Sequence, residues 1–207
     1  MVLRGKFIVL EGSEGCGKST QAELLATYLG AELTREPGGT EIGEAIRSIL
    51  LGGETGRIDG RAELMLMLAA RAQHVAERIG PWLEAGRDVV CDRFSGSTLA
   101  YQGYGRGLPL GEIVAANDLS CAGLQPDLVV LLDLPGGLDG PRRGAPDDRI
   151  EREDGAFFAR VADGFREIAS GDPHRWIVVD GSGSRDEVAR RVRQAVATRL
   201  GMAGRNG

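Results

Sequence analysis

One short segment constrains the fold more than any other. Residues 12–19 read Gly-Ser-Glu-Gly-Cys-Gly-Lys-Ser and match G-x-x-x-x-G-K-[ST] in full. The apolar run Phe7–Leu10 precedes this segment, and a helical pattern from Lys18 to Leu29 follows it. Glycines in this context let backbone N–H groups point at phosphate oxygens, and the helix N-terminus adds positive potential. The sequence therefore predicts a phosphate-binding loop, with Lys18 on the outer phosphates and the Ser19 hydroxyl on Mg²⁺.

The rest of the chain continues this alternation of strand and helix. Short apolar runs predict further strands at residues 31–34, 88–91, 128–132 and 176–179. Helical spacing predicts helices at 41–51, 61–84 (interrupted near Gly80-Pro81), 111–121, 153–169 and 185–200. Such alternation favours an α/β fold with a mostly parallel sheet covered on both faces, and 207 residues favour one domain. Ligands of such sheets bind beyond the carboxyl ends of the strands.

Charge, hydropathy and cysteine content argue against several kinds of partner. The net charge is −5, which argues against a protein that coats nucleic acid. The longest apolar run, residues 64–70, is far shorter than the roughly 20 residues of a membrane span. The three cysteines are Cys16, Cys91 and Cys121, which cannot all pair within one chain and show no zinc-site spacing. Together with the lack of a visible secretory signal, this predicts a cytoplasmic protein.

Arginines and one acid follow the predicted strands. Arg35 comes after the second strand, Asp92-Arg93 after the third, and Arg71 lies within a helix. A guanidinium group grips two phosphate oxygens at once, so these residues suit a reaction between two phosphate-bearing substrates. Asp92 ends an apolar strand, which is a typical setting for a carboxylate that holds Mg²⁺ directly or through water.

A phosphate-binding loop alone leaves several functions open. Asp133-Leu134-Pro135-Gly136 resembles a GTP-switch motif, but no lysine follows Lys18, so the guanine-reading N/T-K-x-D motif is absent. A mechanical ATPase would usually be larger. Three functions remain open: a kinase for a nucleoside monophosphate or another small acceptor, a non-catalytic nucleotide sensor, and, more weakly, a GTP switch.

The order of motifs along nearly the whole chain resembles bacterial thymidylate kinases. Besides the loop, the landmarks are Thr34-Arg35-Glu36-Pro37-Gly38-Gly39, Glu63 with Ala69-Ala70-Arg71-Ala72-Gln73-His74, Asp92-Arg93-Phe94 with Ser97, Ala100-Tyr101-Gln102-Gly103, Pro126-Asp127 and Asp148-Arg149-Ile150-Glu151. The resemblance implies the three-layer α/β/α fold of P-loop NTPases with a five-stranded sheet. It also implies transfer of the γ-phosphate of ATP to dTMP, giving dTDP and ADP for dTTP synthesis, with Mg²⁺ as cofactor.

The resemblance further implies roles for individual residues. The expected catalytic residues are Lys18, Arg93 and Arg149, and Ser19 and Asp92 are the expected metal ligands. The expected ATP contacts are Gly12, Ser13, Glu14, Gly15, Cys16, Gly17, Lys18, Ser19, Thr20, Arg143 and Arg149. The expected dTMP contacts are Glu14 (sugar 3′-hydroxyl), Arg35 and Arg93 (acceptor phosphate), Arg71 (thymine edge), Thr98 (N3 side of the base), Tyr101 (sugar 2′ position), Gln102 (pocket wall) and Met67.

Some positions depart from the usual pattern or receive no role. Met67 stands where a phenylalanine usually stacks on thymine. Gly15 occupies the loop position that carries a helper arginine in some members, so we expect a mobile lid at about 135–152 to supply it, through Arg149 and less directly Arg143 or Arg142. The resemblance also implies a homodimer. His74 and His174 have no visible base or metal partner in the sequence, so we assign them no chemistry.

Overall fold

The computed structural model describes residues 3–52, 56–134 and 149–202. Five strands form one sheet in the order β2-β3-β1-β4-β5, and every neighbouring pair is parallel. The strands are β1 (Phe7–Glu11), β2 (Glu32–Arg35), β3 (Val89–Asp92), β4 (Leu128–Asp133) and β5 (Trp176–Asp180). All five predicted strands are confirmed to within one residue at each end, and the sheet is wholly parallel rather than mostly parallel.

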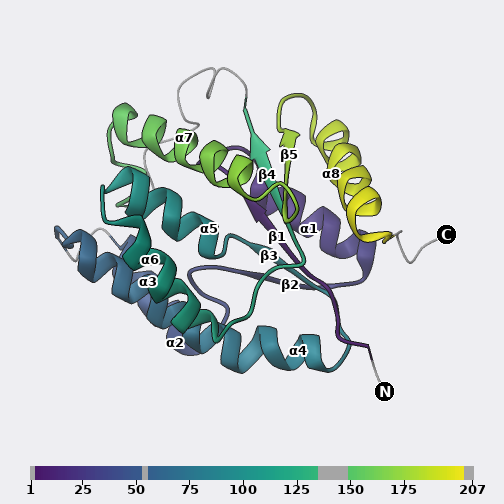
Figure 1. The fold of residues 1–207 in the computed structure, drawn as a ribbon, viewed down its shortest axis with the longest axis horizontal. Coiled ribbons are helices and arrows are strands. Elements are labelled where there is room, and N and C mark those ends of the chain that lie inside the picture. Colours follow the sequence, from purple (N-terminus) through teal and green to yellow (C-terminus); the bar gives the residue numbers. More distant parts are fainter. Residues whose placement is uncertain (1–2, 53–55, 135–148, 203–207) are drawn as a thin grey trace.

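Two hydrophobic cores cover the two faces of the sheet. Alternate side chains of β1 enter different cores, because neighbouring residues of a strand point to opposite faces. Ile8 and Leu10 pack against α1 (Lys18–Leu29) and α8 (Arg185–Leu200), whereas Phe7 and Val9 share a core with side chains of α7 (Gly155–Gly171). Figure 1 shows α8 on one side of the sheet and α3, α5, α6 and α7 on the other. This is the predicted three-layer α/β/α arrangement.

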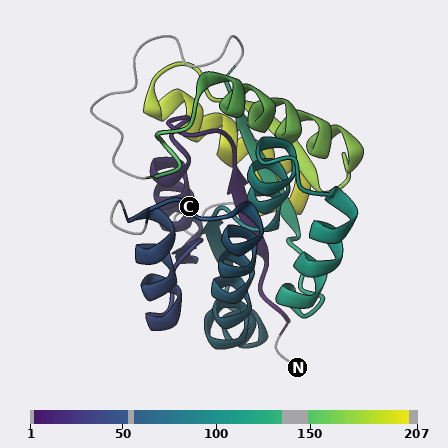
Figure 2. The same ribbon diagram turned by 90° about the vertical axis from the view of Figure 1, so that its left-hand side faces the viewer.

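Residues 60–84 form one helical path with a change of helix type in the middle. It consists of α3 (Gly60–His74), a π-helical turn η1 (Val75–Ile79) and α4 (Gly80–Glu84). The predicted interruption near Gly80-Pro81 is therefore a change of helix type rather than a break, with Pro81 directly after the π-helical turn. α2 (Glu41–Leu51) lies beside α3 (Figure 2). Among the described residues, no helix has the length and apolar character needed to cross a membrane.

A helical segment after β3 was not predicted from the sequence. It comprises the short α5 (Ser95–Thr98) and the π-helical η2 (Leu99–Gly105), followed by α6 (Leu110–Cys121). Its glycines disfavour helix locally but permit close packing. A Cβ atom on Gly96 would lie 2.6 Å from the Trp176 ring, and one on Gly105 would lie 2.6 Å from the Phe157 ring. Tertiary packing thus overrides local propensity in the segment that carries Thr98, Tyr101 and Gln102.

The parallel register brings three functional segments to one edge of the sheet. Asp92 at the end of β3 pairs with Leu10 of β1 on one side and with Arg35 of β2 on the other. The carboxyl ends of β1, β2 and β3 therefore lie side by side. The phosphate-binding loop, the 34–39 turn and the Asp92-Arg93 pair all begin at this edge.

Candidate active site

The loop of residues 12–19 has the conformation that a phosphate cradle requires. Gly12 has φ of 145°, and a Cβ atom there would lie 2.5 Å from the Leu132 carbonyl oxygen, so no other residue fits without a shift. Gly17, with φ of 88°, is the N-cap residue of α1 and has no side chain with which to cap this helix. Lys18 is buried, and its Nζ donates to the Ser13 carbonyl oxygen at 2.6 Å. The helix N-terminus and the lysine ammonium thus converge on the loop.

A hydroxyl and a carboxylate meet beside the loop. The Ser19 hydroxyl donates to Oδ2 of Asp92 at 2.5 Å, and Asp92 is 9% exposed. Its other oxygen, Oδ1, is buried and has no hydrogen-bond partner among the described residues. A buried carboxylate oxygen without a partner, next to a hydroxyl, suits a hard divalent cation such as Mg²⁺. The described residues contain no group of three or more His, Cys, Asp or Glu that could hold a metal, so phosphate oxygens and water would complete its shell.

Arg93 connects the phosphate-binding loop to the helical segment that follows β3. Its Nη2 donates to Glu14 Oε2 at 2.7 Å and to the Tyr101 hydroxyl at 3.1 Å. Its Nη1 donates to the Gly12 carbonyl oxygen and to the Ser97 hydroxyl, both at 3.1 Å. The guanidinium carbon also lies 5.0 Å from the centre of the Tyr101 ring. Contacts on several sides fix the orientation of this cation.

The charge states of Arg93 and Tyr101 follow from these neighbours. Burial lowers the pKa of Arg93, but the nearby carboxylates of Glu14, Asp92 and Glu11 outweigh this effect and raise the pKa above its usual value. Burial also raises the pKa of the Tyr101 phenol, even though Arg93 acts in the opposite direction. At neutral pH the site therefore holds a charged Arg93 against a neutral Tyr101.

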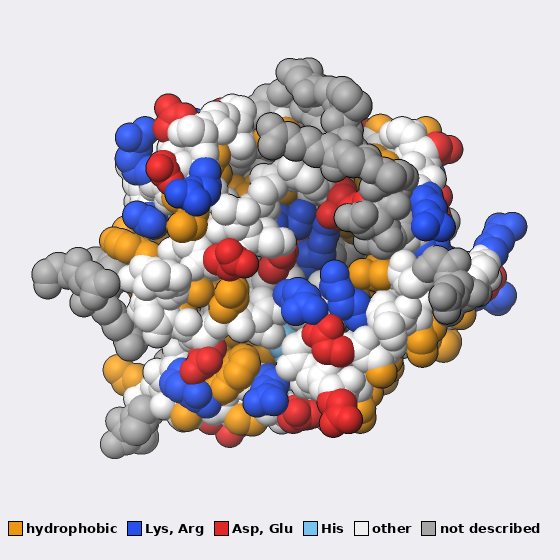
Figure 3. Space-filling view, turned by 180° about the vertical axis from the view of Figure 1, so that it is seen from behind, with side chains coloured by type: hydrophobic (Ala, Val, Ile, Leu, Met, Phe, Trp, Pro, Cys, Tyr) orange, Lys and Arg blue, Asp and Glu red, His pale blue; other side chains and the backbone are white. Residues whose placement is uncertain are grey.

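A cleft opens at this edge of the sheet. Lys18, Ser19 and Asp92 line it from the loop side. All the residues expected to contact dTMP also line it: Glu14, Arg35, Met67, Arg71, Arg93, Thr98, Tyr101 and Gln102. Figure 3 shows Lys and Arg side chains gathered around a hollow on one face of the molecule. The structure thus brings the expected dTMP contacts into one cleft with Glu14, Lys18 and Ser19 of the expected ATP contacts.

Several other residues that line this cleft were not predicted from the sequence. Those without an assigned role are Glu36, Pro37, Arg47, Leu51, Phe94, Ser97 and Ile150. Five of them stand within the quoted motifs, so the assigned neighbours could have pointed to them: Glu36, Pro37, Phe94, Ser97 and Ile150. Arg47 and Leu51 come from α2, and no local pattern in the sequence connects that helix to the site.

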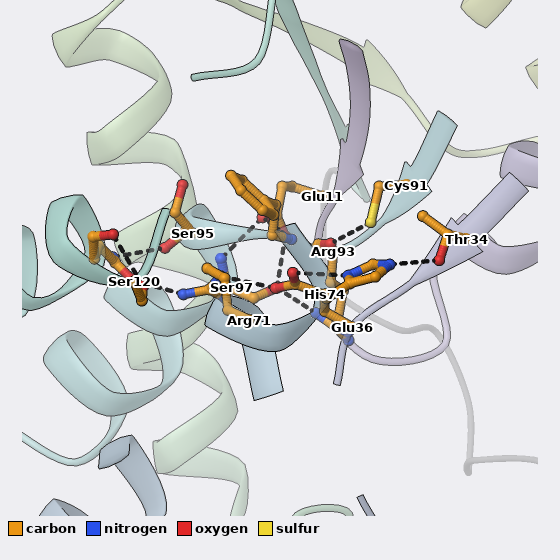
Figure 4. A network of polar contacts seen from close by, with 12 residues as sticks. Glu11, Thr34, Glu36, Arg71, His74, Cys91, Arg93, Ser95, Ser97 and Ser120 are labelled. Carbon is orange, nitrogen blue, oxygen red and sulfur yellow. Dashed lines mark hydrogen bonds and ion pairs between the residues drawn. The ribbon is translucent and has the colours of Figure 1, made fainter. Parts of the chain in front are cut away.

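Arg71 is held from two sides at the base of the cleft. Its Nε donates to Glu36 Oε2 at 2.8 Å, and its Nη1 donates to Asn117 Oδ1 at 2.6 Å. The guanidinium carbon lies 5.1 Å from the centre of the Phe94 ring. The Arg71 side chain is only 3% exposed and that of Glu36 only 5%, so they form a buried ion pair (Figure 4).

His74, for which the sequence showed no partner, has two partners in the structure. His74 is fully buried, with its Nδ1 3.1 Å from Glu36 Oε1 and its Nε2 2.7 Å from the Thr34 hydroxyl. Both partners lie 38 to 40 residues earlier in the chain. Spacing within the helix therefore gave no indication of them.

Glu63, a landmark of the motif order without an assigned role, is the centre of a buried polar cluster. Its carboxylate accepts from Gln102 Nε2 at 2.8 Å and from Arg106 Nη2 at 3.1 Å, and it pairs with Arg149. Arg149 Nε also donates to the Leu50 carbonyl oxygen at 3.1 Å. Burial raises the pKa of Glu63, but hydrogen bonds from Arg106, Gln102 and Arg149 outweigh it and hold the pKa below its usual value.

None of the expected lid arginines is among the described residues that line the cleft. Arg149 does not line the cleft in this structure, although its neighbour Ile150 does. Arg142 and Arg143, with most of the expected lid segment, lie outside the described residues. The structure therefore assigns Arg149 to the Glu63 cluster and gives no position for the other two.

The chain is similar to known thymidylate kinases in both sequence and structure. A family model for thymidylate kinase matches residues 10–192. The chain is 44% identical to a thymidylate kinase of Desulfovibrio desulfuricans, covering 96% of this chain and 98% of that protein. It is 48% identical to one of Synechococcus sp. (strain JA-2-3B'a(2-13)), covering 95% and 97%. The crystal structure of thymidylate kinase from Ehrlichia chaffeensis superposes with a TM-score of 0.79 at 33% identity, covering 93% of this chain and 99% of that one. The chain belongs to the thymidylate kinase family.

Proposed function

We propose that this enzyme uses the cleft to transfer the γ-phosphate of ATP to dTMP, giving ADP and dTDP. It is a nucleoside monophosphate kinase whose product supplies dTTP synthesis. The observation that carries the proposal is the position of Arg93. This acceptor-side cation donates to the Gly12 carbonyl oxygen of the phosphate-binding loop at 3.1 Å and lines the same cleft as Lys18. Donor and acceptor phosphates bound to these groups would be neighbours.

Transfer between two phosphates needs alignment and charge neutralisation more than bond-making chemistry. An oxygen of the dTMP phosphate attacks the γ-phosphorus, and the bond from that phosphorus to the β–γ bridging oxygen breaks. ADP therefore leaves without a covalent enzyme intermediate. Lys18 on the ATP side and Arg93 on the acceptor side offset the negative charge. Mg²⁺, held by Ser19 and Asp92, would neutralise further phosphate charge when it binds with ATP.

The remaining cleft residues would select the acceptor. Arg71 would bind the thymine edge, Thr98 its N3 side, and Tyr101 would crowd the 2′ position and favour deoxyribose. Gln102 is held in the pocket wall by the bond from its Nε2 to Glu63. Their common position in one cleft supports these roles.

Three more residues complete the expected dTMP contacts. Arg35 would contact the acceptor phosphate, and Glu14 the 3′-hydroxyl. Met67 would pack on the base through its polarizable sulfur. All three line the cleft, which supports their assignment to the same substrate.

Arg149 is the remaining expected catalytic residue, and we propose that it contacts the ATP phosphates during transfer. This role requires Arg149 to exchange the Glu63 carboxylate for phosphate oxygens. A lid at about 135–152 stays a prediction, as does the contribution of Arg143. An Arg149→Ala variant with unchanged kcat would remove this residue from the mechanism.

A coupled assay of ADP release tests the proposal. With ATP and Mg²⁺, dTMP should clearly exceed dCMP, dGMP and dAMP as acceptor. Preference for another monophosphate would indicate a kinase of different specificity. ATP binding without dTMP-dependent ADP release would indicate a nucleotide sensor, and preference for GTP over ATP would indicate a switch.

We also propose a cytoplasmic homodimer that does not bind nucleic acid. Exposed apolar side chains on α3 and α6, among them Met65 and Leu119, are suited to burial against a second copy. The net charge of −5 speaks against nucleic acid as a partner. Light scattering coupled to gel filtration would measure the mass, and a monomer at micromolar concentration would contradict the dimer.

A further inference from the structure

The turn of residues 34–39 is wound around the His74 side chain. Thr34 and Glu36 contact the two ring nitrogens, Nε2 at 2.7 Å and Nδ1 at 3.1 Å (Figure 4). Gly39 closes the turn, and a Cβ atom on this residue would lie 2.5 Å from His74 Nε2. The turn therefore fits around an imidazole with almost no spare room on that side.

The partners of His74 determine its tautomer. The Glu36 carboxylate, which also pairs with Arg71, can only accept hydrogen bonds, so Nδ1 of His74 must carry the proton. The Thr34 hydroxyl can then donate to the unprotonated Nε2. Each oxygen of Glu36 consequently has its own donor, Nδ1 of His74 on Oε1 and Nε of Arg71 on Oε2.

This arrangement controls the direction of Arg71. Its Nε is committed to Glu36 and its Nη1 to Asn117, and Phe94 packs against its face. Nη2 has no hydrogen-bond partner among the described residues, while Arg71 itself lines the cleft. A ligand in the cleft would therefore meet the one guanidinium nitrogen without a partner, held by contacts to the other two.

We propose that His74 is a positioning residue for base selection. Its Nδ1–H fixes the Glu36 carboxylate, which fixes Arg71 so that Nη2 presents a donor to the carbonyl at position 4 of a pyrimidine base. This inference rests on the proposed function, because it needs dTMP in the cleft. Cytosine carries an amino group at that position, so a rigid donor rejects it, whereas a loosely held arginine discriminates less.

Two substitutions separate this role from simple space filling. The amide nitrogen of asparagine can occupy the place of Nδ1, and that of glutamine can occupy the place of Nε2. His74→Gln should therefore lose the bond to Glu36, raise the KM for dTMP about tenfold and lower the preference for dTMP over dCMP by a similar factor. His74→Asn should keep that bond and stay within about threefold of wild type. The KM for ATP should be unchanged in both variants, because the phosphate-binding loop does not contact His74.

Two controls separate a specific effect on dTMP from a general loss of structure. His174 is exposed, so His174→Gln should leave all constants unchanged. Melting temperatures show whether each variant is folded. If both His74 variants unfold, the tautomer in the wild-type enzyme still decides, because ¹⁵N NMR of the imidazole must show the proton on Nδ1.

Several results would overturn the inference. They are a proton on Nε2, equal KM values for dTMP in wild type and His74→Gln, or equal losses in the Asn and Gln variants. A wild-type enzyme that fails to phosphorylate dTMP would instead overturn the proposed function, and the same assay measures both. The tautomer result is independent of activity, so the two failures are distinguishable.

Discussion

Replacing Glu63 with glutamine should destabilise the protein by an amount that the structure predicts. The Glu63 side chain is 1% exposed and accepts from Arg106 and Gln102 and pairs with Arg149, groups from segments far apart in the chain. Removing one partner of a buried ion pair typically costs about 3–5 kcal/mol. The arginines are 20% and 13% exposed and can regain some water, so we expect about 2–3 kcal/mol. For a chain of this size that is a fall in Tm of roughly 4–12 °C.

The pH dependence gives a second and independent signature. The folded-state pKa of Glu63 lies below its ordinary value of 4.5, so its stabilisation is present above that value and is lost as the pH falls through the folded-state pKa. Thermal unfolding followed by circular dichroism should show the full gap between wild type and Glu63→Gln at pH 7. The gap should narrow as the pH falls below 4.5.

A matched control uses a second carboxylate on the same arginine. Glu153 accepts from Arg106 Nη1 at 2.5 Å but is 29% exposed, so Glu153→Gln should cost less than about 1 kcal/mol. The predicted role of Glu63 is refuted if Glu63→Gln has the same Tm as wild type. It is also refuted if the difference in Tm between the two proteins is the same at all pH values.

Further predictions concern the reaction and a second buried carboxylate. Lys18→Ala or Arg93→Ala should each lower kcat at least ~10²-fold at saturating substrates, because each removes a fixed charge from the transferring phosphates; wild-type turnover would exclude the role. Asp92→Asn should raise the Mg²⁺ concentration needed for half-maximal activity, measured by metal titration; an unchanged Mg²⁺ requirement would exclude Asp92 as a ligand. Burial raises the pKa of Glu11, although the hydrogen bond from Ser97 acts in the opposite direction. This carboxyl therefore destabilises the fold as the pH rises through its folded-state pKa. Chemical unfolding should therefore show the stability of wild type relative to Glu11→Gln improving as the pH falls from 7 toward 4.5, and a gap that does not change with pH would contradict this.

Local sequence determined the bounds of those helices whose capping residues are sequence neighbours. The helices predicted at Lys18–Leu29, Glu41–Leu51 and Arg185–Leu200 have those bounds in the structure. Glycine in a left-handed conformation ends the first and third, and a capping box of Ser184 and Glu187 begins the third. The residues that set these boundaries are sequence neighbours, so the sequence contains the whole signal.

The motif order also identified the types of residue in the cleft before any geometry was known. Every residue expected to contact dTMP lines one cleft, although these residues come from five segments of the chain. A motif records which chemistry a position supplies. It does not record which side chain holds that group in place.

Tertiary structure alone decided those partners. The helical segment of residues 95–105 forms because its glycines admit Trp176 and Phe157, which are distant in sequence. His74 gains Thr34 and Glu36, and Arg149 pairs with Glu63, only when the sheet and helices have assembled. Local periodicity and loop motifs act over a few residues, whereas a buried polar group must find its partner wherever the packed chain places one. The sequence by itself therefore determined the strands, most helices and the types of residue in the cleft, and packing determined which partners hold those side chains in place.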